Sequence, residues 1–204
     1  MSHSAQPIRS SPCVALVGPY LSGKTSLLES LLFMTGSLSR KGTVKDSNMI
    51  GDHTPESKSR NMTVELTLAT LDYLDQQWTF IDCPGSIELS YETISALMVA
   101  DIVVIVCEPI PDKVMMLAPL FKFLEDYPIP HCLFVNKIDS LNLQDMKLGP
   151  LLEGLKEISK VPLILRQVPI YDHTSVTGYL DLVSERAYQY IPHRTSPVIS
   201  PPEF

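Results

Sequence analysis

The fold of this chain is predicted by the stretch Gly18-Pro19-Tyr20-Leu21-Ser22-Gly23-Lys24-Thr25, which matches the spacing G-x-x-x-x-G-K-[ST] at every fixed position. An apolar run, Cys13 to Val17, precedes it, and a helical pattern, Ser26 to Phe33, follows it. This strand–loop–helix context favours a phosphate-binding loop over the alternative, a glycine-rich turn before an ordinary helix. Glycines let the backbone N–H groups surround an anion, and the start of the helix adds partial positive charge.

The residue types within this stretch predict separate roles in nucleotide binding. Lys24 is expected to reach the outer phosphates, and the Thr25 hydroxyl is expected to ligate Mg²⁺. The predicted nucleotide-binding residues of the loop are Gly18, Ser22, Gly23, Lys24, Thr25 and Ser26.

Size and charge restrict the classes of function. The chain has 204 residues, 45% hydrophobic and 19% charged, which suits one globular domain. Its net charge of −7 offers no overall basic surface, so direct DNA binding is not expected, although a local patch could still face RNA. The four cysteines lack C-x-x-C spacing and are expected to be buried free thiols of a reducing cytosol.

The apolar runs exclude a membrane span. The longest strongly apolar run, Ile102 to Cys107, is far too short to cross a bilayer, and the polar N-terminus lacks the apolar segment of a signal peptide. We therefore expect a cytoplasmic protein with no membrane partner.

The chain alternates between strand and helix patterns, which predicts an α/β fold with a mostly parallel sheet. Strands are expected at Pro12–Val17, Thr63–Leu71, Trp78–Ile81, Ile102–Cys107, Cys132–Val135 and Leu163–Val168, and helices at Thr25–Thr35, Glu88–Ala100, Lys113–Asp126 and Leu143–Lys160. A turn at Asp75–Gln77 makes the second and third strands a hairpin, and Tyr179–Tyr190 is expected to form a short strand or helix. Residues 1–11 and the proline-rich residues 191–204 are expected to be disordered.

Asp82-Cys83-Pro84-Gly85 follows the third predicted strand. An acid at this point is placed to hold Mg²⁺, and the Gly85 N–H is placed to reach the γ-phosphate. The alternative interpretation is an ordinary turn, since Asp, Pro and Gly all favour turns.

Asn136-Lys137-Ile138-Asp139 also follows a predicted strand. The Asp139 carboxylate can accept hydrogen bonds from two guanine donors that adenine lacks, and such a site discriminates strongly. The Lys137 stem can cover the base, and Asn136 can tie this loop to the phosphate loop. This pattern follows the phosphate loop and the Asp82–Gly85 motif in order along the chain, and in that context it favours guanine over adenine.

Two further positions have weaker patterns. Thr63 ends the polar stretch 37–62, where its hydroxyl could ligate Mg²⁺ when that stretch closes over a γ-phosphate; the alternative is an ordinary strand threonine. Glu108-Pro109, after a predicted strand, is interpreted as a turn.

Together these motifs resemble the translational GTPases, specifically the G domain of elongation factor G in a divergent elongation factor G-like branch. Ser59-Arg60-Asn61-Met62-Thr63-Val64 and Gly178-Tyr179-Leu180-Asp181-Leu182-Val183 are similar to further segments of that domain. The resemblance implies a P-loop NTPase with three α/β/α layers, a mostly parallel sheet with one antiparallel strand, and GTP or GDP with Mg²⁺ as ligands.

The resemblance also implies site residues. Lys24, Thr63, Gly85 and Ser86 would be the catalytic positions, and Thr25, Thr63 and Asp82 would hold the metal. Guanine nucleotide would be bound by Asp82, Gly85, Asn136, Lys137 and Asp139 in addition to the loop residues. The ribosome would be a partner through domains outside this chain.

The departures from the family pattern are informative. Ser86 stands where the family has a His that orients the attacking water, and Leu21 replaces an Asp. The fifth motif, S-A-x, is missing, so residues 12–190 are expected to form a G domain that is incomplete at its C-terminal end.

Three functions remain open on the sequence. The first is the GTP-hydrolysing domain of an elongation factor G-like protein, and the second is a GTP- or GDP-binding regulator with little or no hydrolysis, because of Ser86. The third is a structural remnant with an empty pocket.

Overall fold

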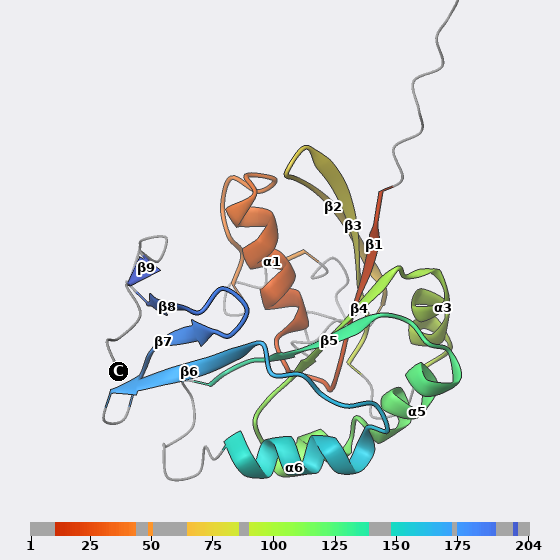
Figure 1. Ribbon diagram of the computed structural model, residues 1–204. Helices are drawn as coiled ribbons and strands as arrows, with labels where there is room; N and C mark the ends of the chain where they lie inside the picture. The colour runs from red at the N-terminus through yellow and green to blue at the C-terminus, as the bar shows by residue number, and fades with distance from the viewer. Residues whose placement is uncertain are drawn as a thin grey trace, which may run out of the picture.

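The computed structural model describes residues 11–43, 49–50, 65–85, 90–138, 148–172, 175–190 and 198–199. Their strands form two sheets, one of five strands and one of four. Figure 1 shows helices on both sides of the larger sheet and the smaller sheet beside it.

The larger sheet is built around its first strand. Its order is β2-β3-β1-β4-β5. β1 (Cys13–Val17) pairs in parallel with β3 (Gln76–Asp82) and with β4 (Ile102–Cys107), and β4 pairs in parallel with β5 (His131–Val135). β2 (Thr67–Tyr73) lies antiparallel to β3 at the edge. The predicted mostly parallel sheet with one antiparallel strand is therefore confirmed.

The β2–β3 hairpin turns earlier than its sequence suggested. Gln76 and Gln77, predicted as part of the turn, belong to β3, and the turn is formed by Leu74 (φ 51) and Asp75 (φ 58). Two consecutive residues with positive φ match the twist of the flanking strands. The turn therefore joins the strands with two residues, although neither is a glycine.

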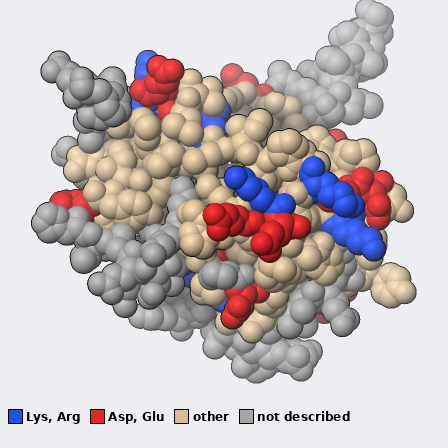
Figure 2. All heavy atoms as spheres, turned by 60° about the horizontal axis from the view of Figure 1, so that its bottom comes forward, with Lys and Arg blue, Asp and Glu red and all other residues tan. Residues whose placement is uncertain are grey.

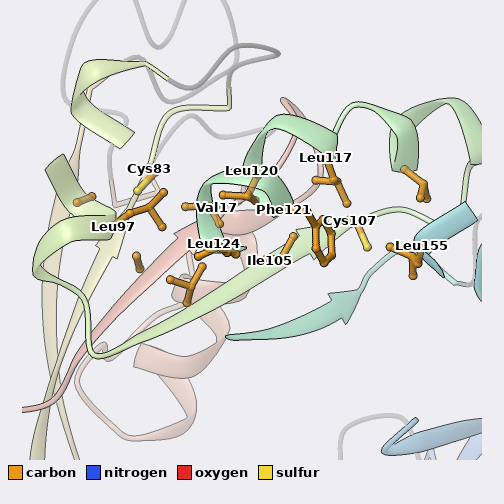
Figure 3. Packing of buried hydrophobic residues seen from close by; sticks show 14 of the residues in the cluster. Val17, Cys83, Leu97, Ile105, Cys107, Leu117, Leu120, Phe121, Leu124 and Leu155 are labelled. Atoms are coloured by element: carbon orange, nitrogen blue, oxygen red, sulfur yellow. The ribbon is translucent and has the colours of Figure 1, made fainter. Parts of the chain in front are cut away.

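Helices cover both faces of this sheet. α1 (Lys24–Met34) contributes Leu28 and Leu32 to a cluster with Val14 and Leu16, while Ala15 and Val17 point to the opposite face. That alternation follows from the two-residue period of a strand. The opposite face packs against α3 (Tyr91–Val99), α4 (Pro111–Met115), α5 (Ala118–Asp126) and α6 (Leu148–Ile158), as the side chains in Figure 3 show. The fold is the expected three-layer α/β/α arrangement.

Proline divides one predicted helix into two. The pattern Lys113–Asp126 suggested a single helix, but the structure has α4 and then α5, which begins at Ala118 with Pro119 in its first turn. A proline at this position costs no helical hydrogen bond, because the first N–H groups of a helix have no partner within the helix. Of the predicted helix Leu143–Lys160, residues 143–147 lie outside the described residues.

The C-terminal strands correct the sequence prediction. Leu163–Val168 was predicted as a strand among the parallel ones, but 163–166 form no strand, and the Ile164 side chain is 92% exposed. β6 (Gln167–Asp172), β7 (Ser175–Asp181), β8 (Arg186–Gln189) and β9 (Val198–Ile199) instead form a separate antiparallel sheet. Asp181 organises the β7–β8 turn, because its carboxylate accepts the N–H groups of Val183 and Ser184. β9 lies within residues 191–204, the segment expected to be disordered.

All four cysteines are free, but they are not equally buried. Cys83 and Cys107 are buried as predicted, Cys13 is partly exposed and Cys132 is exposed. Cys132 differs because it alternates along β5 with Leu133 and Val135, which pack against the core, and so points to the other face of the sheet, where Phe134 is also exposed. Among the described residues, no helix is long and apolar enough to cross a membrane.

Charge is mixed on the face turned toward the viewer in Figure 2. Acidic and basic side chains of the described residues lie next to one another there, and they do not gather into one broad basic area. That face offers no described surface of the kind that binds a polyanion.

Candidate functional site

The candidate site lies where the parallel strands of the larger sheet end. The phosphate-loop stretch 18–25 connects β1 to α1, Asp82 ends β3, and Asn136 directly follows β5. Because parallel strands end at the same edge of a sheet, segments far apart in sequence meet here. This edge, at a point where the chain connections reverse, is where open α/β sheets bind ligands.

Two glycines of the loop stand where no side chain fits. Gly18 has φ 142, and a Cβ there would lie 2.1 Å from the Val106 carbonyl oxygen. Gly23 has φ 96, and its Cβ would lie 2.2 Å from Asn136 Nδ2. The motif glycines therefore let the loop pass close to β4 and to the loop after β5. Leu21 also has a positive φ of 58, which is strained for a residue with a side chain.

Lys24 is held inside the loop. It is 5% exposed, and its Nζ donates to the carbonyl oxygens of Gly18 at 3.1 Å and Pro19 at 2.9 Å. Burial lowers the pKa of the Lys24 ammonium, and the negative charge of Asp82 opposes this shift. The ammonium is thus already at the concave side of the loop, where a phosphate would be surrounded.

Thr25 and Asp82 form a direct contact. The Thr25 hydroxyl donates to Asp82 Oδ2 at 2.6 Å. Asp82 Oδ1 is buried without a hydrogen-bond partner, and so is Ser22 Oγ. Burial raises the pKa of Asp82 to about 6, although the Thr25 hydrogen bond and the Lys24 charge act in the opposite direction.

These oxygens fit the predicted Mg²⁺. A hydroxyl and a carboxylate are hard oxygen donors, which Mg²⁺ prefers, and a buried carboxylate oxygen with no partner is costly unless something pairs with it. Among the described residues, no group of three or more His, Cys, Asp or Glu side chains forms a metal site of its own. A cation here would therefore also need oxygens from its nucleotide.

Gly85 lies against the phosphate loop. A Cβ on Gly85 would be 2.5 Å from Tyr20 Cα and 2.9 Å from Lys24 Nζ. This close approach explains why the segment after β3 needs a glycine at this position. It also brings the Gly85 backbone beside the lysine that is expected to contact the outer phosphates.

The loop after β5 is fastened to the phosphate loop by two side chains. Asn136 Nδ2 donates to the Ser22 carbonyl oxygen at 2.8 Å. Lys137, with φ 58, donates to the Leu21 carbonyl oxygen at 2.5 Å. The structure thus brings together the predicted residues Ser22, Lys24, Thr25, Asp82, Gly85, Asn136 and Lys137 at one edge, and Ser26 lies in the first turn of α1.

Three predicted site residues, Thr63, Ser86 and Asp139, lie outside the described residues. Their roles in metal binding, hydrolysis and guanine recognition stay predictions.

Two buried acids were missed by the sequence interpretation. Glu108, interpreted only as part of a turn, is 6% exposed and pairs with Lys113 at 2.8 Å and Lys137 at 3.0 Å. Glu29 of α1 is 1% exposed and accepts the N–H groups of Gly42 and Ile50. Neither lies in a motif, and the only signal was an acid inside or next to an apolar run.

Comparisons with known proteins agree with this arrangement. The family model described as the elongation factor Tu GTP binding domain matches residues 9–180. An elongation factor G-like protein of Synechocystis is 51% identical over 177 residues, which make up 87% of this chain and 26% of that protein. Elongation factor G 2 of Borreliella burgdorferi is 26% identical over 168 residues, or 82% of this chain and 25% of that protein.

A solved structure from Thermus thermophilus has the same fold. Its TM-score is 0.81 at 27% identity, and the match covers 94% of this chain and 28% of that one. The chain thus spans about a quarter of the length of the relatives that it matches. The resemblance to the elongation factor G-like branch is confirmed, and the chain belongs to the family of elongation factor Tu GTP-binding domains.

Proposed function

We propose that this chain is the Mg²⁺-dependent, guanine-nucleotide-binding domain of an elongation factor G-like protein and that it hydrolyses GTP. The observation that carries the proposal is the hydrogen bond from Asn136 to the Ser22 carbonyl. It joins the phosphate loop to the loop after β5, Asn136 to Asp139, which is predicted to recognise the base and is called the base-recognition loop below. Family membership supports the choice of nucleotide.

Different residues of the site would bind the phosphates and the metal ion. The loop N–H groups and the Lys24 ammonium would stabilise phosphate charge, with Lys24 exchanging its hydrogen bonds to Gly18 and Pro19 for phosphate oxygens. Thr25 and Asp82 would hold Mg²⁺, directly or through water. Bound Mg²⁺ neutralises charge on the phosphates during phosphoryl transfer.

Closure of the site would involve two segments: residues 37–63, which precede β2, and the segment around Gly85, which follows β3. We propose that Thr63 ligates Mg²⁺ only when the 37–62 stretch closes over a γ-phosphate, and that the Gly85 N–H then contacts the same phosphate. Binding would thereby order these segments in the triphosphate state and release them after hydrolysis.

A second function is a nucleotide-binding regulator with little hydrolysis, and Ser86 is the observation that favours it. Serine is too short to occupy the position of the family's histidine side chain. Single-turnover GTP hydrolysis by the parent chain and by Ser86→His separates the two functions. If the parent chain hydrolyses GTP as fast as Ser86→His does, Ser86 does not slow hydrolysis, and the argument for the regulator is lost.

The experiment that tests nucleotide choice is a titration of the 204-residue chain with GDP, GTP, ADP and ATP in excess Mg²⁺. We expect saturable binding of the guanine nucleotides, at least about a hundredfold tighter than that of the adenine nucleotides, because adenine would leave the Asp139 carboxylate unpaired. Equal affinities would contradict the guanine assignment. Binding of none of the four would favour the structural-remnant alternative.

The wider biological role is proposed from the relatives. Cosedimentation of the full-length protein with ribosomes, with GDP or a non-hydrolysable GTP analogue, tests the ribosome as partner. We infer a cytoplasmic location from the same family membership, and cell fractionation checks it.

A further inference from the structure

We propose that Glu108 is a positioning residue for nucleotide binding: it holds the Lys137 side chain against the phosphate loop, across the place where the base would lie. The inference rests on the proposed function, because it assumes that a guanine nucleotide occupies this site. None of the sequence motifs contains Glu108.

Glu108 lies at the centre of a three-element contact. It directly follows β4, while Lys113 belongs to α4 and Lys137 follows β5. Each carboxylate oxygen bonds a different lysine: Oε2 accepts from Lys113 Nζ at 2.8 Å, and Oε1 accepts from Lys137 Nζ at 3.0 Å. One buried acid therefore links the end of β4 to a helix and to the base-recognition loop.

The second bond of Lys137 makes this link relevant to the nucleotide. The same Nζ that contacts Glu108 also donates to the Leu21 carbonyl oxygen at 2.5 Å. The Lys137 ammonium therefore bridges two elements: it donates one hydrogen bond to the phosphate loop and another to Glu108 at the end of β4. A lysine stem fixed at its tip keeps one orientation, so little side-chain entropy remains to be lost when a base packs on it.

The electrostatics of Glu108 favour a fixed arrangement. The side chain of Glu108 is 7% exposed, whereas that of Lys137 is 41% exposed. Burial by itself would raise the pKa of Glu108, but the hydrogen bonds from Lys113 and Lys137 outweigh it and lower that pKa. The carboxylate is therefore charged at neutral pH, and charge-assisted hydrogen bonds are short and strong.

Lys113 has a different part in this contact. It shares Glu108 but makes no contact with the phosphate loop among the interactions of the described residues. Its ion pair braces α4 against the end of β4. A change at Lys113 therefore tests the brace alone, whereas a change at Glu108 affects both the brace and Lys137.

The test measures the release of GDP carrying a fluorescent N-methylanthraniloyl group on the ribose. Glu108→Gln keeps the shape of the side chain but removes its charge. The amide has one oxygen to accept from one lysine, and its NH₂ group faces the other lysine, from which it cannot accept a hydrogen bond. We expect release to accelerate about tenfold in E108Q, as for the loss of one charge-assisted hydrogen bond. We expect Glu108→Asp, which keeps the charge on a shorter side chain, to recover part of the loss.

Two controls separate positioning from stability. Lys113→Met is expected to lower the melting temperature about as much as E108Q does, while changing GDP release less than twofold. In the Lys137→Met background, E108Q is expected to have no further effect on release, because its effect passes through Lys137. If E108Q fails to fold, the same cycle is measured with E108D.

The outcomes for the two proposals are distinguishable. If the parent chain binds GDP and ADP equally, the proposed function fails. If the parent prefers GDP but E108Q releases it at the parental rate, or if E108Q acts equally with and without Lys137, the positioning role alone is overturned. Equal acceleration in K113M and E108Q would likewise overturn it, because that result assigns the effect to the brace.

Discussion

The Asn136 side chain donates to the Ser22 carbonyl oxygen at 2.8 Å, across 114 residues of sequence. This one hydrogen bond joins the loop that is expected to select the base to the loop that is expected to hold the phosphates. A Cβ on Gly23 would lie 2.2 Å from the same Asn136 nitrogen, so the contact depends on the glycine beside it. The two motifs therefore act as one structural unit.

Asn136→Ala tests this unit directly. We expect the free energy of unfolding to fall by about 1 kcal/mol, because one partly buried hydrogen bond is lost. GDP affinity is expected to fall about tenfold, since the two loops lose their common support. Urea denaturation and calorimetric titration measure the two effects. Gln76→Ala, an exposed position at the opposite end of β3, is the control, and unchanged GDP affinity in N136A would contradict the role of the contact.

Gly23→Ala is expected to destabilise the ligand-free protein by about 1–3 kcal/mol, because alanine is strained at φ 96 and its Cβ would overlap Asn136. In the N136A background the overlap is relieved and only the backbone strain remains, so the cost should be smaller. Gly154→Ala in α6 is the matched control. A Cβ there would meet only Val114 Cγ1, at an ordinary contact distance of 3.6 Å, and alanine should raise stability by up to about 1 kcal/mol. Equal effects of the two glycine substitutions in urea denaturation would contradict this prediction.

The stability of the ligand-free protein should depend on pH through Asp82. Its pKa is raised from 3.8 to about 6 in the folded protein, so between these values the folded state binds more protons than the unfolded state. The contribution of Asp82 to stability therefore falls as pH rises from about 4 to about 6, by up to about 3 kcal/mol in total.

Urea denaturation of the parent and Asp82→Asn across this pH range measures that contribution as a difference. The difference should grow in favour of D82N as pH rises and then level off above about pH 6. Asp126→Asn, an exposed change at the end of α5, controls for net charge. A parent–D82N difference that does not change with pH would show that Asp82 titrates at its ordinary pKa.

Removal of Mg²⁺ should affect the nucleotide complex through Thr25 and Asp82. We expect excess EDTA to accelerate GDP release from the parent by about tenfold or more, equivalent to at least about 1.4 kcal/mol. In Thr25→Ala the response to EDTA should be smaller, because one predicted metal ligand is already absent.

Thr35→Ala at the other end of α1 is the matched control for Thr25→Ala. The Thr35 hydroxyl contacts the carbonyl oxygens of Leu31 and Leu32 and the Ser37 hydroxyl, far along the helix from the loop. Its response to EDTA should equal that of the parent. The same response in T25A and the parent would exclude Thr25 as a metal ligand.

The larger sheet and the positions of the motifs could be predicted from the chain alone. Apolar runs such as Ile102–Cys107 are continuous because parallel strands are buried on both faces, and each motif directly follows such a run. The second sheet could not be predicted in the same way. The apolar run at 163–165 resembles a buried strand, yet Ile164 is exposed, and pairing instead begins at Gln167, where β7 supplies the partner.

By itself, the sequence determined the phosphate loop, the order of the motifs and the family, because these depend on residue types at short, fixed spacings. Only the tertiary structure decided which distant side chains meet: Thr25 with Asp82, Asn136 with Ser22, and Glu108 with two lysines. Glu108 lies in no motif, and its only signal in the sequence is that it follows the apolar run Ile102–Cys107. Its partners come from α4 and from the loop after β5, so its role depends on where three elements end in space.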